Sequence, residues 1–135
     1  MSQSPESLES AIRSSVQRAL EEDLVPDGDL TAALVSPELL TSGTFTARQD
    51  GILAGVGCAT ETFRQVDPTI KISWHCSDGD RFNAGEALAT LEGPLAKVLT
   101  AERTALNFLS HLSGIATSVA QWVNNTDGGA TIWDT

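Results

Sequence analysis

A long helical pattern begins at Pro94, and it constrains the fold more than any other feature of this sequence. Apolar side chains recur every three or four residues along it, as they do on one face of an α-helix. They are Leu95, Leu99, Leu106, Leu109, Leu112, Ile115, Val119 and Trp122. A helix of this kind must bury its apolar face against other elements. Ser113-Gly114 predicts a break or kink between two helices, because glycine weakens a helix and serine competes for backbone hydrogen bonds.

A second, amphipathic helix is predicted over residues 4–23. Ser4 can accept hydrogen bonds from the first backbone N–H groups, and Pro5 suits the first helical position because its missing donor costs nothing there. The apolar stripe of this helix consists of Leu8, Ile12, Val16 and Leu20. We interpret the stripe as a core or interface surface. The segment that follows, residues 25–29, is typical of a turn.

The region between the two helices, residues 43–92, has mainly the alternating pattern of antiparallel β structure. Two alternating runs flank Asp50-Gly51 and predict a β-hairpin over residues 43–56. Further strands are expected at residues 70–74 and 87–91, with a short helix over residues 59–66. An antiparallel sheet with helices laid on it predicts an α+β fold.

The charge balance excludes some classes of function. The chain carries 18 acidic and 8 basic residues, a net charge of −10, and the basic residues are scattered. Because nucleic-acid binding requires a basic surface, no nucleic-acid partner is expected. No apolar run approaches the ~18 residues of a membrane span, and the first residues lack the pattern of a secretory leader. The sequence therefore predicts a cytoplasmic protein without a membrane partner.

Metal and nucleophilic chemistry have little support in the residues. The two cysteines and two histidines are too few for a zinc site, which needs about four ligands at short spacings. His75 beside Cys76 is more typical of a strand than of a metal pair. The acidic segments at residues 27–29 and 78–80 lack the other ligands of a calcium loop, so we interpret both as turns. No metal ligand and no catalytic residue is predicted in this chain.

Glu102 is an unusual residue for its place in the long helix. It lies three residues after Leu99 and four before Leu106, so helical spacing places its carboxylate on the apolar face. A charge buried there is costly unless it is paired and hydrogen-bonded. The spacing therefore predicts a partner for Glu102.

A polar stripe on the same helix is the candidate site. Arg103 and Asn107 are four residues apart and share a face. Ser110 and Gly114 continue that face, so a cation, an amide, a hydroxyl and a gap lie in line. Such a stripe could bind an anionic ligand or contact another helix. From the residues alone, an interhelical salt bridge with polar packing is the more common role of such groups.

Several motifs together resemble one enzyme family. The strongest is the helical run Leu99–Phe108, which is framed by Leu91–Pro94 and Leu112–Thr117. Weaker matches are Glu22–Leu24, Gly28–Thr31, Asp50–Gly55 and Asp78–Asp80. In this order and at about this spacing, the motifs are similar to those of quinolinate phosphoribosyltransferases, also called carboxylating nicotinate-nucleotide pyrophosphorylases. The resemblance extends over nearly the whole chain.

The resemblance implies a glycosyltransferase of NAD biosynthesis. Members of the family transfer phosphoribose from phosphoribosyl pyrophosphate to the ring nitrogen of quinolinate. Decarboxylation follows, and the products are nicotinate mononucleotide, pyrophosphate and CO2, with Mg2+ helping to hold the pyrophosphate. The implied fold is an amino-terminal α/β sandwich domain followed by an open α/β barrel, assembled as a homodimer or a higher homo-oligomer.

Carried over residue by residue, the resemblance assigns substrate binding to Arg103 and Thr135. Arg103 matches the family arginine that reaches the quinolinate site of a neighbouring subunit, where a guanidinium suits a carboxylate. Thr135 matches the opening of the family's Thr-Arg-Lys segment, at the end of an apolar strand expected over residues 130–135. The Arg and Lys of that segment are missing here. Glu102 is carried over only as a structural partner.

The expected architecture is a sandwich domain over residues 1–112 and the first strand of a truncated α/β barrel within residues 113–135. Because most of the family's anion-binding residues are missing and the net charge is −10, the chain alone is expected to be inactive. Two alternatives remain open. One is a molybdenum-transport-associated relative with the same architecture, and the other is a stand-alone, non-catalytic dimerisation module.

Overall fold

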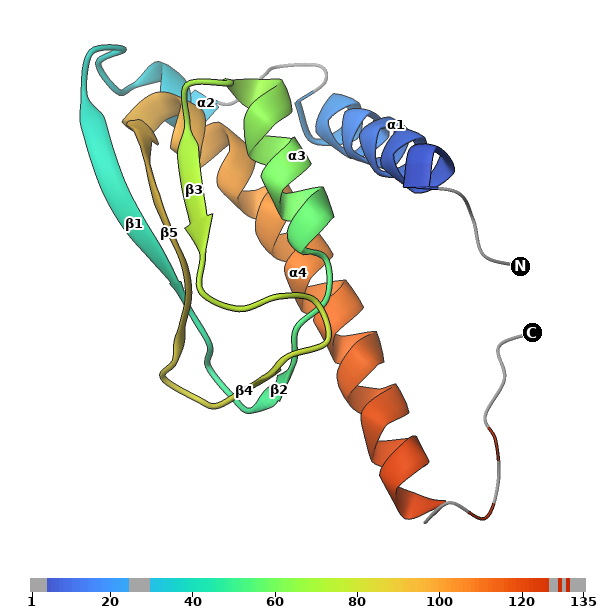
Figure 1. Cartoon of the computed structure of the whole chain (residues 1–135). Coiled ribbons are helices and arrows are strands. Elements are labelled where there is room, and N and C mark those ends of the chain that lie inside the picture. Colours follow the sequence, from blue (N-terminus) through green and yellow to red (C-terminus); the bar gives the residue numbers. More distant parts are fainter. Residues whose placement is uncertain (1–4, 25–29, 127–128, 130, 132–135) are drawn as a thin grey trace.

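The computed structural model describes residues 5–24, 30–126, 129 and 131, and shows strands packed against helices (Figure 1). In chain order the elements are α1 (Pro5–Leu24), α2 (Leu30–Ala33), β1 (Leu40–Thr46), β2 (Gly51–Ile52), α3 (Val56–Val66), β3 (Lys71–Trp74), β4 (Arg81–Phe82), β5 (Ala87–Pro94) and α4 (Leu95–Asn125). The predicted α+β class is confirmed, since the sheet is antiparallel and carries helices. The expected cap at Ser4, the turn over 25–29 and most of the strand over 130–135 lie outside the described residues.

The main sheet consists of three antiparallel strands in the order β1-β5-β3. Leu91, on the central strand β5, lies opposite Gly43 of β1 and Ile72 of β3, and this row faces the core. The neighbouring row is polar and exposed, because successive side chains of a strand point to opposite faces. The sheet therefore has one buried face and one solvent face, as its alternating sequence pattern predicted.

The hairpin predicted over residues 43–56 is wrong. β1 pairs with β5, and β2 pairs instead with β4, a short strand that the sequence pattern did not reveal. The Asp50 carboxylate accepts a hydrogen bond from the backbone N–H of Ala84 at 2.8 Å, so it bridges to a distant turn. Directly after β1, the chain is still hydrogen-bonded to the residue that precedes β5, since the Ala47 N–H donates to the Glu86 carbonyl at 2.9 Å. A local alternating pattern cannot identify its partner strand, because pairing depends on the tertiary context.

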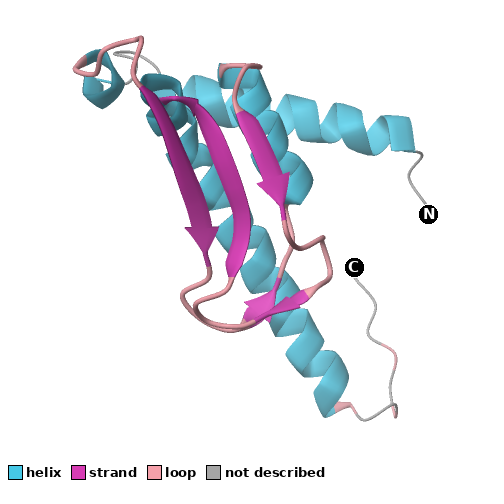
Figure 2. Cartoon of the chain, turned by 60° about the vertical axis from the view of Figure 1, so that its left-hand side comes forward, coloured by secondary structure: helices cyan, strands magenta, loops and turns pink. Residues whose placement is uncertain are grey.

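The core lies between the sheet and the helices α3 and α4, which cover the same face of the strands (Figure 2). Phe63 of α3 and Leu53 are each only 1% exposed. The ring of Phe63 packs at 6.0 Å, centroid to centroid, against Phe45 of β1. α1 packs against α3, and its buried side chains include Val16 and Leu20 from the predicted apolar stripe.

α4 is a single helix from Leu95 to Asn125, so the predicted break at Ser113-Gly114 is wrong. The Ser113 hydroxyl does not compete for the backbone bonds of its own helix, because it bonds to the backbone of Ala54. It accepts from the Ala54 N–H at 3.0 Å and donates to the Ala54 carbonyl at 3.1 Å. α4 passes through the predicted domain boundary between residues 112 and 113, and that boundary stays a prediction.

Candidate functional site

Small residues determine how α4 packs. Its buried side chains are those of Val98, Ala101, Thr104, Ala105 and Leu109. Ala101 and Ala105 have no exposed surface, so the helix contacts the core through its smallest side chains. Leu99 and Leu106 are consequently only half-buried at the edge of this contact. Glu102, between them, is exposed, and the prediction that its carboxylate lies on the buried face is therefore wrong.

Arg103 and its predicted stripe lie on the exposed side of α4. Arg103, Asn107, Ser110 and Gly114 are all exposed, and helical spacing aligns them along one face. Within the described parts of the chain, Arg103 forms neither a hydrogen bond nor an ion pair. The intrachain salt bridge that the residues alone favoured is therefore not formed there. A guanidinium presents five N–H donors in a planar fork, which suits a carboxylate ligand.

A surface hollow of about 510 Å³ continues this stripe toward the end of α4. It is lined by Ser110, His111, Gly114, Ile115, Ser118, Val119 and Trp122. Ser110 and Gly114 belong to both the stripe and the hollow, and Trp122 is 65% exposed. The exposed side of α4 thus has a cationic part at Arg103 and an apolar part beyond Gly114.

Two hydroxyl groups of α4 hold the segment between β2 and α3, a contact that the sequence did not reveal. The Thr117 hydroxyl accepts from the Ile52 N–H at 2.9 Å, and Ser113 bonds to both backbone groups of Ala54. α4 can approach this segment closely because Gly51 and Gly55 have no Cβ. A Cβ on Gly51 would lie 3.0 Å from the Thr117 hydroxyl oxygen, and one on Gly55 would lie 3.1 Å from a Leu112 methyl group.

A second contact fixes α4 at the turn that carries Arg103. Thr104 is 2% exposed, and its hydroxyl donates to a carboxylate oxygen of Asp23 at 2.5 Å. Asp23 lies at the exposed end of α1, in the motif Glu22–Leu24. Sequence reasoning missed this pair. Its signal was a threonine on the buried face of a helix, which requires a hydrogen-bond partner.

The acidic turn at residues 78–80 is structural, as predicted. A carboxylate oxygen of Asp78 accepts from the Val56 N–H at the start of α3 at 3.0 Å, and Asp80 accepts from the Ser77 N–H at 2.8 Å. The other acidic segment, residues 27–29, lies outside the described residues. No group of three or more His, Cys, Asp or Glu side chains in the described residues could hold a metal ion.

The two cysteines lie on α3 and on the loop after β3, and the pKa of each thiol is raised. Burial, and then the charge of Asp78, raise the pKa of the Cys58 thiol. Burial, and then the charges of Glu86 and Asp80, raise the pKa of the Cys76 thiol. A raised pKa disfavours the thiolate, which is the nucleophilic and metal-binding form.

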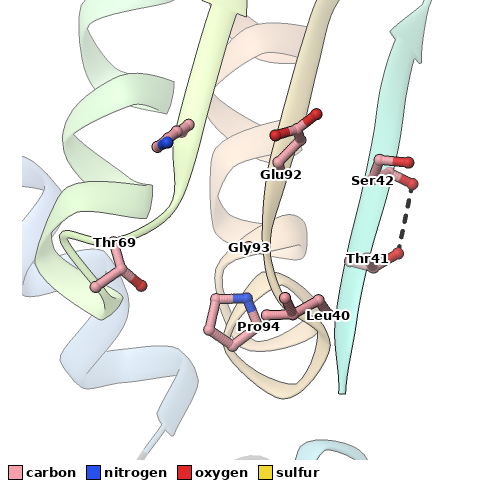
Figure 3. Close-up of a pocket in the computed structure, with 8 residues that line it drawn as sticks. Leu40, Thr41, Ser42, Thr69, Glu92, Gly93 and Pro94 are labelled. Atoms are coloured by element: carbon pink, nitrogen blue, oxygen red, sulfur yellow. Dashed lines mark hydrogen bonds between the residues drawn. The ribbon is translucent and has the colours of Figure 1, made fainter. Parts of the chain in front are cut away.

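A second hollow, of about 450 Å³, lies at one end of the sheet (Figure 3). It is lined by Leu40, Thr41, Ser42, Thr69, Lys71, Glu92, Gly93 and Pro94. Glu92 stands between Ser42 and Lys71 in the strand register, so each charge of the hollow has an opposite charge on the next strand. With one cation and one anion, both exposed, this hollow is a poor match for a polyanionic ligand.

Of the two substrate-binding residues assigned by resemblance, the structure describes one. Arg103 is exposed on α4, and Thr135 lies outside the described residues. Among the described helices, none combines the length and the apolar character that crossing a membrane requires.

Comparison with known proteins gives a consistent set of relatives. The family profile described as quinolinate phosphoribosyl transferase, N-terminal domain, matches residues 20–113. The quinolinate phosphoribosyltransferase (decarboxylating) 1 of Nicotiana glauca is 40% identical over 103 residues, which are 76% of this chain and 29% of that protein. The carboxylating nicotinate-nucleotide pyrophosphorylase of Mycobacterium leprae is 36% identical over 121 residues, which are 87% of this chain and 43% of that protein.

Solved structures have the same fold. The nicotinate-nucleotide pyrophosphorylase from Francisella tularensis superposes with a TM-score of 0.84 at 34% identity, covering 89% of this chain and 43% of that one. The chain thus spans less than half the length of these relatives. The family match ends at residue 113, so it includes α3 and the part of α4 that carries Arg103, Asn107 and Ser110.

Proposed function

Because the chain belongs to the family of the quinolinate phosphoribosyl transferase N-terminal domain, we propose that it is the amino-terminal part of a quinolinate phosphoribosyltransferase. The whole protein converts quinolinate and phosphoribosyl pyrophosphate to nicotinate mononucleotide, pyrophosphate and CO2, in NAD biosynthesis. The observation that carries the proposal is an exposed arginine, with no partner among the described residues, at the matching position of α4.

Arg103 binds quinolinate in this proposal. Quinolinate is a dicarboxylate, and a guanidinium can bind a carboxylate through two parallel hydrogen bonds. Arg103 lies on the outer side of α4, away from the core of its own chain. This placement supports a role at the site of a neighbouring subunit. Thr135 is the second proposed substrate contact.

Most of the active site belongs to other segments of the whole protein. Both substrates are polyanionic, whereas this chain has a net charge of −10, so the electrostatic attraction must come from elsewhere. The described residues contain no group of three or more His, Cys, Asp or Glu side chains that could hold a metal ion. In this proposal Mg2+ binds with the pyrophosphate, mainly at other segments of the whole protein. The 135-residue chain alone is expected to be inactive.

A homodimer or a higher homo-oligomer is part of the proposal. An arginine that acts at a neighbouring site requires a second subunit beside α4. The apolar side chains of Ile115, Val119 and Trp122 are exposed next to the stripe, which supports a contact with another copy. We also propose a cytoplasmic location. Some plant relatives carry the words mitochondrial or chloroplastic in their names, so subcellular fractionation is the appropriate measurement.

The first experiment determines the gene sequence beyond the codon for Thr135 and assays the complete gene product. Purified protein should form nicotinate mononucleotide and CO2 from quinolinate and phosphoribosyl pyrophosphate. A reading frame that stops after Thr135, or a complete product without this activity, would reject the enzyme and leave the dimerisation module as the better hypothesis.

The second experiment tests Arg103. Arg103→Ala in the complete gene product should weaken quinolinate binding by about 2–4 kcal/mol if the ion pair is well desolvated, with phosphoribosyl pyrophosphate binding unchanged. Arg48→Ala is the matched control, because Arg48 is another exposed arginine and lies outside α4, on the loop after β1. Equal quinolinate affinities in the wild type and the Arg103 variant would remove this residue from the site.

A further inference from the structure

We propose that Thr104 and Asp23 are positioning residues for Arg103, an inference that rests on the proposed function because its readout is quinolinate binding. The starting observation is the direction of the Thr104 hydroxyl. In the described part of the chain, the buried polar side chains are those of Thr62 and Thr104. Thr62 bonds within its own helix, donating to the Cys58 carbonyl at 2.7 Å. Thr104 instead donates to Asp23 at 2.5 Å, across to α1.

The geometry of α4 alone does not require this bond. A threonine inside a helix can donate to the carbonyl four residues earlier, and two other threonines of α4 do so. Thr100 donates to the Ala96 carbonyl at 3.0 Å, and Thr117 donates to the Ser113 carbonyl at 2.7 Å. Among the described threonines of α4, Thr104 is thus the one whose hydroxyl donates to a residue of another element.

The bond acts on the helical turn that carries Arg103. Thr104 directly follows Arg103 in α4, so the Asp23 carboxylate is hydrogen-bonded to the residue next to Arg103. The middle of α1 is held separately, because the Gln65 amide donates to the Arg13 carbonyl at 3.1 Å. With its middle fixed on α3 and its end fixed at Thr104, α1 can brace α4 at this turn. The bond is charge-assisted, which makes it stronger than a bond between neutral groups.

Asp23 holds the turn at Thr104 without forming an ion pair with the Arg103 guanidinium. No ion pair joins Asp23 and Arg103 in the described structure, so the donors of Arg103 stay available to a ligand. Ligand binding by an arginine depends on where its helix turn lies, and small displacements weaken it. Asp23 and Thr104 therefore act on quinolinate through Arg103.

Three variants of the complete gene product test this inference. Thr104→Val removes the hydroxyl at nearly constant shape, and Thr104→Ser retains it. Thr104→Val should raise the Kd for quinolinate roughly 3- to 10-fold, as expected for a residue that acts through another. It should leave the Kd for phosphoribosyl pyrophosphate unchanged, and Thr104→Ser should restore the quinolinate value. Asp23→Ala removes the acceptor from the exposed side, so it gives the same test if the valine variant folds poorly.

A double-mutant cycle separates positioning from general stability. In an Arg103→Ala background, Thr104→Val should no longer change quinolinate binding, because there is no arginine left to position. An effect of Thr104→Val that persists in that background, or a loss of phosphoribosyl pyrophosphate binding, overturns the inference. If Arg103→Ala weakens quinolinate binding but Thr104→Val and Asp23→Ala do not, only the inference fails. If Arg103→Ala itself has no effect, the proposed role of Arg103 fails and the inference fails with it.

Discussion

Replacing Gly55 with alanine should destabilise this fold through two separable effects. Gly55 precedes α3 with a φ of 100°, and an added Cβ would lie 3.1 Å from a Leu112 methyl group and 3.3 Å from the Phe108 carbonyl oxygen. A left-handed backbone costs a residue with a Cβ about 1–2 kcal/mol. Crowding against a packed helix costs about 1–3 kcal/mol more. The free energy of unfolding should therefore fall by about 2–5 kcal/mol.

Gly79 supplies the matched control. Its φ is 92°, but nothing lies within 4 Å of an added Cβ. Gly79→Ala should therefore cost only the backbone term, about 1–2 kcal/mol. Urea unfolding of the 135-residue chain, followed by far-ultraviolet circular dichroism, measures both losses. With a slope of about 2 kcal/mol per molar urea, Gly55→Ala should lower the midpoint by about 1–2.5 M.

The difference between the two variants isolates the contact between Gly55 and α4. Equal losses would refute the reasoning, because they would show that Leu112 and the backbone near Phe108 move aside at no cost. A change in the urea slope would instead indicate a different denatured or native state, and the comparison would then have to be made from calorimetric stabilities.

Two further predictions concern side-chain hydrogen bonds, one within α3 and one between α4 and β2. The hydrogen bond from Arg64 is the main cause that lowers the pKa of the Glu61 carboxyl from 4.5 to about 2. The ionised Glu61 therefore stabilises the folded state fully above about pH 4.5, and this contribution is lost as the pH falls toward 2. Because its arginine partners are exposed, we expect only about 1 kcal/mol, measured as a pH-dependent stability that Glu61→Gln abolishes. Thr117→Val leaves the Ile52 N–H without its acceptor and should cost about 1–3 kcal/mol, whereas Thr117→Ser should not. Hydrogen exchange at the Ile52 amide gives an independent check, since its protection should fall in the valine variant alone.

The elements that the sequence predicted well are those with a local signal. The amphipathic patterns of α1 and α4 report helices directly, because residues three and four apart share a face. Strand pairing is not local, and β1 pairs with β5 rather than with β2, which is nearer in the sequence. The predicted position of Glu102 failed for a related reason. Spacing identifies residues that share a face, but the alanines at 101 and 105 decide which face meets the core.

The same difference between local and non-local signals applies to the candidate site. Arg103 was identified from a motif and its helical stripe, both of which can be read along a continuous segment. Its brace could not be identified, because Asp23 and Thr104 are 81 residues apart. A threonine on the buried face of a helix indicates that a hydrogen-bond partner is needed, but no pattern of charge or hydrophobicity identifies that partner before the helices are placed. The residue that we propose to bind substrate is therefore visible in the sequence, and the residues that we propose to position it are identified only in the fold.

The contacts of α4 give a physical reason why two of the family-like motifs occur together. Ser113 and Thr117 supply hydroxyls to backbone groups at Ile52 and Ala54, which would otherwise lack those hydrogen-bond partners. These bonds require a close approach, which Gly55 permits because it has no Cβ. We expect a change that crowds this contact to shift α4 against the sheet and with it the turn that carries Arg103. If Arg103 acts at a neighbouring site, as proposed, selection for that role would also act on both segments.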